Sequence, residues 1–121
     1  MALKIIFSDI NKTEQDYLNC IETEEYYNGA SRRTLTFEIA RNAANIEMLD
    51  TLCSAEENCK KLELINEDEG ITNIYEDYVL KLKIAVEPVL VDAEKQTYED
   101  RIKLKLGKRT YIEQKLHDLG L

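Results

Sequence analysis

Alternating apolar and polar residues dominate the chain and predict β-strands with one buried and one wet face. The clearest examples are TLTFEIA at 34–40, LKLKIAV at 80–86 and RIKLKL at 101–106. Asn28-Gly29 precedes the first of them, and this dipeptide is typical of a tight hairpin turn because both residues tolerate a positive φ. The pattern therefore predicts a chain built mainly from antiparallel strands.

Shorter patterns extend this prediction to the first half of the chain. Strands are expected at Ala2–Ser8, Tyr17–Tyr27 and Cys59–Asn66, with a polar loop at Asp9–Asp16. The N-terminal segment has an acid directly after a short apolar run and no small-residue cleavage site, so we interpret it as a strand rather than a signal peptide. Pro88 cannot donate to a strand ladder and marks a bulge, an edge or a strand break.

Two segments have helical spacing instead. Ile46, Leu49, Leu52 and Cys53 recur at helical intervals within Asn45–Ser54, which predicts a short middle helix. The C-terminal segment carries a T-x-x-E capping box, an apolar stripe and a glycine stop: Thr110, Glu113, Ile112, Leu116, Leu119 and Gly120. We predict one mainly β (α+β) domain over residues 1–121, a small antiparallel β-barrel or sandwich with a short middle helix and a C-terminal helix packed on it.

The charge of the chain limits the classes of partner that it can bind, and its cysteines indicate the redox compartment. The net charge is −8; residues 1–70 hold 15 acids and 7 bases, and residues 71–121 hold 9 of each. This acidic balance speaks against nucleic-acid binding, and no apolar run is long enough for a transmembrane helix. The three cysteines, Cys20, Cys53 and Cys59, lack paired spacing, so we expect free thiols in a reducing compartment.

No recognisable constellation for catalysis or metal binding stands out. His117 is the single histidine, which argues against zinc and against serine or cysteine triads. The acidic turn before Gly70 fails as a calcium loop because Ile65 occupies the first ligand position. The glycines are isolated, so no phosphate loop is present. We expect no cofactor, no metal and no enzymatic activity.

Candidate interface residues come from the polar faces of the predicted strands. A hairpin between the strands around 80–86 and 101–106 would align five basic side chains on one outward face: Lys81, Lys83, Arg101, Lys103 and Lys105. The strand after the Asn28-Gly29 turn shows Thr34, Thr36 and Glu38 on its polar face. Arg32 and Arg33 lie at its mouth, and Tyr26 and Tyr27 precede the turn. Tyrosine is enriched at interfaces because it buries area and keeps a polar tip.

Three stretches together resemble small structural proteins encoded in the tail modules of long-tailed bacteriophages and prophages. They are NGASRRTLTFEI, ITNIYEDYVLKLKIAVEPVLV and RIKLKLGKRTYIEQKLHDLGL, and the resemblance covers about residues 26–121. It implies a tube, baseplate, tail-completion or connector protein that performs no chemistry. It also implies assembly with itself, as a ring, or with other tail proteins, first in the host cytoplasm and then in the virion tail.

Two other function classes stay open. A monomeric β-rich adaptor or inhibitor would bind another protein through exposed strands and tyrosines. A small enzyme would need two carboxyl groups converging in a cleft, one of them with a raised pKa. The division of charge between the two halves favours the self-assembling tail protein over both, because an acidic region of one copy could meet the basic stripe of the next.

Overall fold

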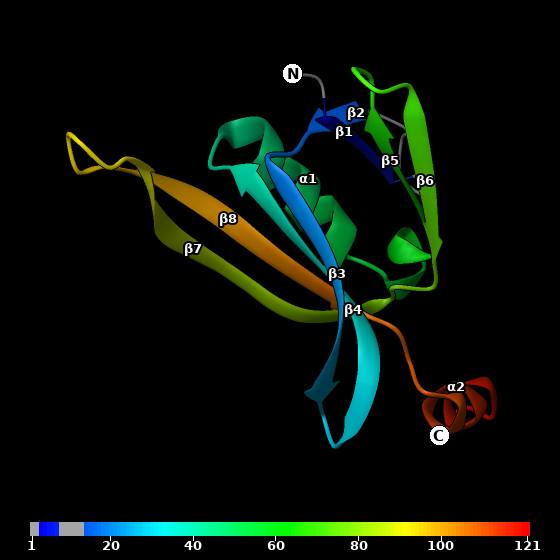
Figure 1. Cartoon of the computed structure of the whole chain (residues 1–121). Coiled ribbons are helices and arrows are strands. Elements are labelled where there is room, and N and C mark those ends of the chain that lie inside the picture. Colours follow the sequence, from blue (N-terminus) through cyan, green and yellow to red (C-terminus); the bar gives the residue numbers. More distant parts are fainter. Residues whose placement is uncertain (1–2, 8–13) are drawn as a thin grey trace.

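Two four-stranded antiparallel sheets and two α-helices make up the chain, which is described here over residues 3–7 and 14–121 of a computed structural model (Figure 1). One sheet has the strand order β2-β1-β5-β6 and the other the order β3-β4-β8-β7. The elements are β1 (Leu3–Phe7), β2 (Glu14–Asp16), β3 (Asn19–Tyr27), β4 (Ala30–Ala40), α1 (Ala43–Cys53), a 3-10 turn η1 (Glu56–Cys59), β5 (Lys61–Asn66), β6 (Ile71–Glu76), β7 (Leu80–Asp92), β8 (Thr97–Gly107) and α2 (Tyr111–Asp118). The mainly β composition and the two helices confirm that part of the prediction.

The core contains the apolar positions that the alternation picked out. Leu35, Phe37 and Ile39 of β4 are buried and lie beside the buried side chains of β8. The rest of the core comes from the other sheet, from α1, from η1 and from the segment before β7: Ile5, Phe7, Leu62, Leu64, Met48, Leu49, Leu52, Cys59, Tyr78 and Val79. The two sheets and α1 therefore share one apolar core.

The hairpin and the helix caps form where local sequence predicts them. Asn28 and Gly29 have φ values of 52° and 82°, the conformation that a tight β3–β4 turn requires. Asn42 caps α1, and its side chain accepts a 2.8 Å hydrogen bond from the Asn45 backbone N–H. Thr110 and Glu113 form the complete capping box of α2.

Two strands differ from the prediction. Glu14–Asp16 was assigned to a loop, but it forms β2 because it pairs with β1. β6 was not assigned as a separate strand; it follows the acidic turn and pairs with β5 along its whole length. Ala2, Ser8 and residues 9–13 of the predicted N-terminal strand and loop lie outside the described residues.

β7 is an edge strand with an irregular register. Lys81 pairs with Leu106, but Lys83 pairs with Lys105, so the register shifts at Leu82. Because paired residues share a face, the shift turns Lys81 toward the core side and Lys83 toward the outer side. The predicted alignment of both lysines on one face is therefore wrong for Lys81. Pro88 lies within this edge strand, opposite Asp100, which agrees with its expected place at an edge.

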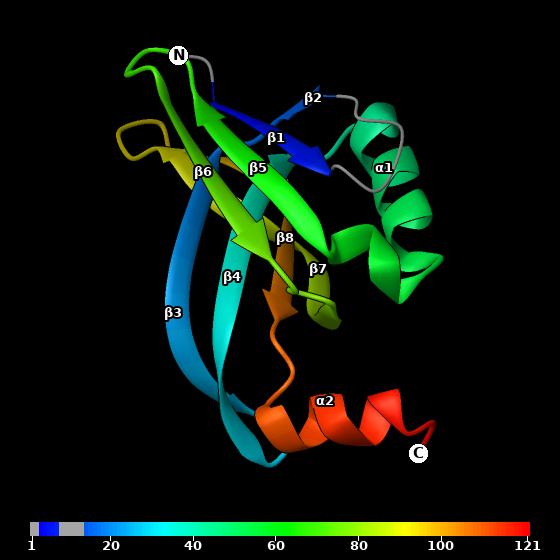
Figure 2. The ribbon, with the colours of Figure 1, turned by 90° about the vertical axis from the view of Figure 1, so that its right-hand side faces the viewer.

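The C-terminal helix was expected to pack on the sheets, but it contributes nothing to the core. No residue of α2 is buried. Figure 2 shows α2 below the sheets and well apart from α1. The three linking residues Lys108–Thr110 lead from the end of β8 to a helix held by polar contacts.

Candidate interaction surface

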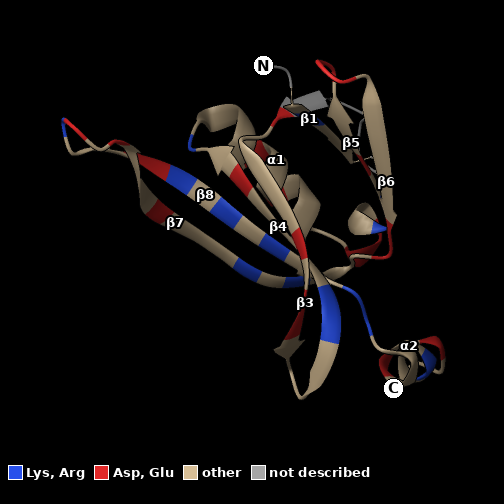
Figure 3. Ribbon diagram, viewed as in Figure 1, with Lys and Arg blue, Asp and Glu red and all other residues tan. Residues whose placement is uncertain are grey.

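Charged residues recur along the strands of the β3-β4-β8-β7 sheet (Figure 3). On its outer face these charges pair with one another. Lys105 Nζ donates to Glu25 Oε1 at 3.1 Å and to the Tyr27 hydroxyl at 2.9 Å. Lys103 lies 3.6 Å from Glu38 and 3.2 Å from Glu87. Acids from the flanking strands thus interleave with the basic residues of β8, which removes the repulsion that a bare basic stripe would suffer.

Further pairs complete this surface, which we call the charge ladder. Arg101 contacts Glu38 at 3.3 Å, and Lys83 contacts Glu87 at 3.0 Å. Lys83 lowers the pKa of Glu87, and hydrogen bonds from Thr34 and then Lys105 lower the pKa of Glu25. Most of the predicted basic stripe is therefore engaged within the chain.

Lys81 takes no part in the charge ladder. Its ammonium group donates instead to the backbone oxygen of Ala55 at 2.9 Å, at the start of η1. Thr34 is fully buried: its hydroxyl donates to Glu25 at 2.7 Å, and it lies 2.9 Å from the Thr23 hydroxyl. Both residues serve contacts inside the chain.

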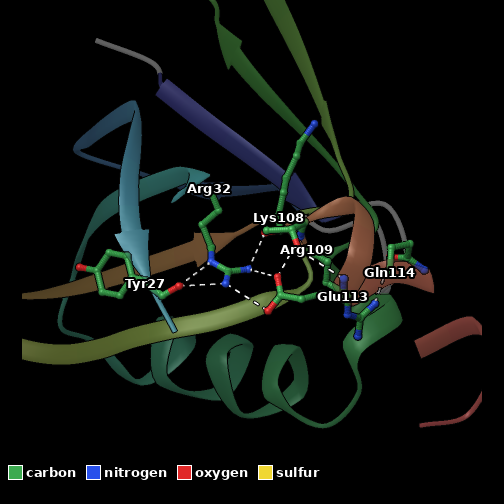
Figure 4. Close-up of polar contacts among 7 residues, drawn as sticks. Tyr27, Arg32, Lys108, Arg109, Glu113 and Gln114 are labelled. Carbon is green, nitrogen blue, oxygen red and sulfur yellow. Dashed lines mark hydrogen bonds and ion pairs between the residues drawn. The ribbon is translucent and has the colours of Figure 1, made fainter. Parts of the chain in front are cut away.

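Arg32, predicted to lie at an open strand mouth, has a side chain that is only 1% exposed. Its guanidinium donates to both carboxylate oxygens of Glu113, at 2.5 and 3.1 Å, and to the backbone oxygens of Tyr27 and Lys108 (Figure 4). Arg32 is therefore the anchor that holds the start of α2 against the β3–β4 turn. An outward-facing arginine at this position is a correction to the prediction.

Glu113 has two functions at this anchor. It pairs with Arg32 and also accepts a 2.9 Å hydrogen bond from the backbone N–H of Thr110, the cap of α2. The Arg32 hydrogen bond, followed by that of Thr110, lowers the pKa of Glu113 to about 2. Sequence reasoning identified Glu113 for the cap, but the sequence contains no signal for its partner 81 residues away.

α2 turns its polar side toward its own chain. Gln114, His117 and Asp118 line a cavity of about 540 Å³ together with Lys60 and Val79. His117 lies 3.2 Å from Glu56, and Arg109 pairs with the same carboxylate. Polar contacts beside this cavity therefore join helix and body, where an apolar seam would normally bind a helix to its core.

The apolar side of α2 consequently faces away from the body. At 100° per residue, Ile112, Leu116 and Leu119 lie nearly opposite the cavity-lining residues. Ile112 is 69% exposed and Leu119 is 72% exposed. This surface, called here the α2 stripe, is the apolar pattern that the sequence showed, on a helix that was expected to pack on the sheets.

The remaining predicted interface residues lie near the β3–β4 turn. Tyr26 is 73% exposed and Arg33 is exposed, whereas Tyr27 and Thr36 are partly covered. Lys105 lies 5.0 Å from the centre of the Tyr27 ring, so Tyr27 belongs to the charge ladder. Participation of these residues in an interface stays a prediction.

Within residues 3–7 and 14–121, no cluster of three or more histidine, cysteine, aspartate or glutamate side chains is arranged to hold a metal ion. The same residues contain no helix that is long and apolar enough to cross a membrane. Comparisons of the chain with family models, with curated proteins and with solved structures found no match.

Proposed function

We propose that the chain is a non-enzymatic structural protein that assembles with copies of itself or with neighbouring proteins. It would be one of the small tail proteins of long-tailed bacteriophages and prophages, folded as a compact β-barrel or sandwich. It would assemble in the host cytoplasm and end in the virion tail. The observation that carries the proposal is the α2 stripe, an apolar helix face turned away from its own core.

The electrostatics of the surface favour a structural role over acid–base chemistry. The pKa values of Glu25, Glu56, Glu87 and Glu113 all move down, because each carboxylate accepts hydrogen bonds from basic or hydroxyl groups. None of these four carries the raised pKa that a general acid needs. Their charge is used to join strands and to fix α2.

The ion pairs within the charge ladder also change which interactions we expect to hold two copies together. A neighbour's acidic region would have to compete with Glu25, Glu38 and Glu87 for the basic residues of the charge ladder. Apolar contact through the α2 stripe meets no such competition, since its side chains are exposed. We therefore propose that assembly depends mainly on apolar burial, with charge selecting the orientation.

A monomeric adaptor or inhibitor is the second candidate. Tyr26, Tyr98 and Tyr111 are well exposed, and exposed tyrosines are common at transient protein contacts. Such a protein would use the same surfaces for a different chain. The two candidates differ in whether the purified chain associates with itself.

Light scattering and sedimentation of the purified chain, over a wide range of protein and salt concentration, test the proposal. We expect oligomers whose mass rises with protein concentration to a defined size. The double variant Ile112→Ser/Leu119→Ser should lower that mass, while Ile74→Ser, an exposed apolar residue of β6, serves as the matched control. A monomer at every concentration would overturn self-assembly and favour the adaptor.

A further inference from the structure

A second apolar surface runs along β7 toward the β7–β8 turn, away from α2. Ile84 and Val86 of β7 pair with the core residues Leu104 and Ile102, so they lie on the core side of the sheet. They are nevertheless 46% and 50% exposed, because the core ends before it reaches this edge strand. Leu90 continues the row and is also exposed. We call Ile84, Val86 and Leu90 the β7 row.

We propose that the α2 stripe of one copy packs on the β7 row of a second copy of the chain. The proposal rests on the proposed self-assembly and names its two surfaces. The helix would lie on the uncovered part of the sheet, so that the core of one copy is completed by a helix from the next. Each copy would then donate one helix and receive one.

The helix cannot satisfy the β7 row of its own chain. α2 follows the Gly107 end of β8, whereas Leu90 lies near the Thr97 end, about 30 Å away at ~3.4 Å per residue. Arg32 also holds the start of α2 at the β3–β4 turn. Figures 1 and 2 both show the β7–β8 turn and α2 at opposite ends of the molecule.

The α2 stripe is about half as long as the β7 row. From Ile112 to Leu119 the helix rises about 10 Å, at ~1.5 Å per residue. Along β7, Ile84 to Leu90 spans about 20 Å at ~3.4 Å per residue. Three helix side chains at i, i+4 and i+7 can thus cover about half of the row, where apolar burial stabilises the contact.

Charge complements the apolar match. The end of the β7–β8 hairpin, residues 89–100, holds four acids and one base: Asp92, Glu94, Glu99, Asp100 and Lys95. The segment at 108–115, which leads into α2, holds three bases and one acid: Lys108, Arg109, Lys115 and Glu113. Glu113 is already paired with Arg32, and Arg109 with Glu56, so Lys108 and Lys115 supply the positive charge of the segment. Asp100 is paired with Arg41, which leaves Asp92, Glu94 and Glu99 as the acids of the hairpin that can attract them.

The contact is heterologous when each copy donates its helix to one neighbour and receives a helix from another, whereas a reciprocal exchange between two copies would form a two-fold dimer. Heterologous contacts produce a closed ring when the rotation between copies closes, and an open filament when it does not. A two-fold contact of α2 with α2 would instead stop at a dimer. The size of the assembly therefore distinguishes a copy that binds two neighbours from a copy that binds one.

Two complementary variants test the proposal. Ile112→Asp destroys the α2 stripe but leaves the β7 row intact, and aspartate in the first turn of a helix suits the helix dipole. Val86→Asp destroys the β7 row but leaves the α2 stripe intact. Each variant alone should weaken self-association by about tenfold or more. An equimolar mixture should form a discrete heterodimer, since one intact pair of surfaces remains.

The outcomes separate this inference from the proposed function. A wild-type chain that oligomerises, while either variant still oligomerises or the mixture stays monomeric, would overturn the α2–β7 contact and leave self-assembly standing. A wild-type monomer at all concentrations would overturn both. Circular dichroism and thermal unfolding of each variant check that it is folded, with Ile74→Asp as the matched surface control.

Cross-linking gives a second measurement that does not depend on the aspartate variants. In a Cys53→Ser background, Leu119→Cys combined with Val86→Cys should form disulfide-linked multimers on mild oxidation. Replacing Val86→Cys by Ile74→Cys should abolish these multimers. Equal cross-linking at both positions would indicate non-specific contact and would contradict the proposed pairing.

Discussion

Arg32 of β4 and Glu113 of α2 lie 81 residues apart in the sequence and form a two-pronged ion pair that fastens the C-terminal helix to the sheet. The two partners differ in their surroundings. The arginine side chain is 1% exposed, whereas the glutamate side chain is 35% exposed. Loss of the carboxylate leaves a buried cation, and loss of the guanidinium leaves a carboxylate that water can reach.

This asymmetry predicts the effect of removing Glu113. Glu113→Gln should lower the free energy of unfolding by about 2 kcal/mol, less than for a fully enclosed pair because Arg32 keeps two carbonyl acceptors. Hydrogen exchange of residues 111–119 should increase. Urea unfolding measures the first effect and mass spectrometry the second. Glu99→Gln, on the exposed hairpin, is the control, and equal losses in both variants would contradict the anchor.

Acid should release the same contact. The pKa of Glu113 falls from 4.5 to about 2 in the folded chain, so its stabilisation is complete above pH ~5 and is lost as the pH falls from about 4.5 to 2. The difference in unfolding free energy between wild type and Glu113→Gln should be constant above pH 5 and shrink toward zero near pH 2. Urea titrations at a series of pH values measure it. A difference that persists at pH 2 would exclude this cause.

The charge ladder should respond to reversal of one of its members. Lys105→Glu would place a second acidic group beside Glu25 and remove the hydrogen bond to Tyr27, so the free energy of unfolding should fall by about 2 kcal/mol. Lys95→Glu in the β7–β8 turn is the matched reversal and should change it by about 0.5 kcal/mol or less. Thermal and urea unfolding of the two variants give the comparison. Similar losses would show that the ladder adds nothing specific.

The three cysteines should differ in reactivity. Cys53 is exposed, Cys59 is buried, and burial, followed by the nearby Glu22, raises the pKa of Cys20 to about 12. Iodoacetamide at pH 8 should therefore modify Cys53 first, and all three after unfolding in urea. Peptide mass spectrometry reads the sites. Rapid labelling of Cys20 in the folded chain would contradict its environment.

Gly107 should resist enlargement for a packing reason. A Cβ atom there would lie 2.7 Å from Leu82 Cδ1 and 3.1 Å from Arg32 Cδ. Gly107→Val should lower the unfolding free energy by about 2 kcal/mol. The additional variant Leu82→Ala should recover part of that loss, because it removes the nearest obstacle. Strictly additive effects in the double variant would show that the two residues do not interact.

The local features of the fold were predictable because their determinants lie within a few residues. Asn28-Gly29 specifies its turn, Thr110 and Glu113 specify a helix start, and the alternation in β4 specifies which of its faces meets the apolar core. Pairing between distant segments was not predictable in the same way. No residue near Arg32 in the sequence indicates that it pairs with Glu113.

Two further differences have physical causes of the same kind. The register shift at Leu82 places Lys81 and Lys83 on opposite faces of the sheet, although the sequence there alternates without interruption. The amphipathic pattern of α2 correctly predicts a helix with an apolar face. It does not say that the chain's own core would leave that face uncovered.

Pro88 has a consequence for how copies of this chain could join. β7 is an outer strand, and a proline in its middle removes a backbone donor from the edge that another strand would have to read. A neighbour therefore cannot continue the sheet residue by residue along β7. Ordered assembly through side chains therefore remains possible, whereas fibre growth by backbone hydrogen bonding along β7 is disfavoured by the proline.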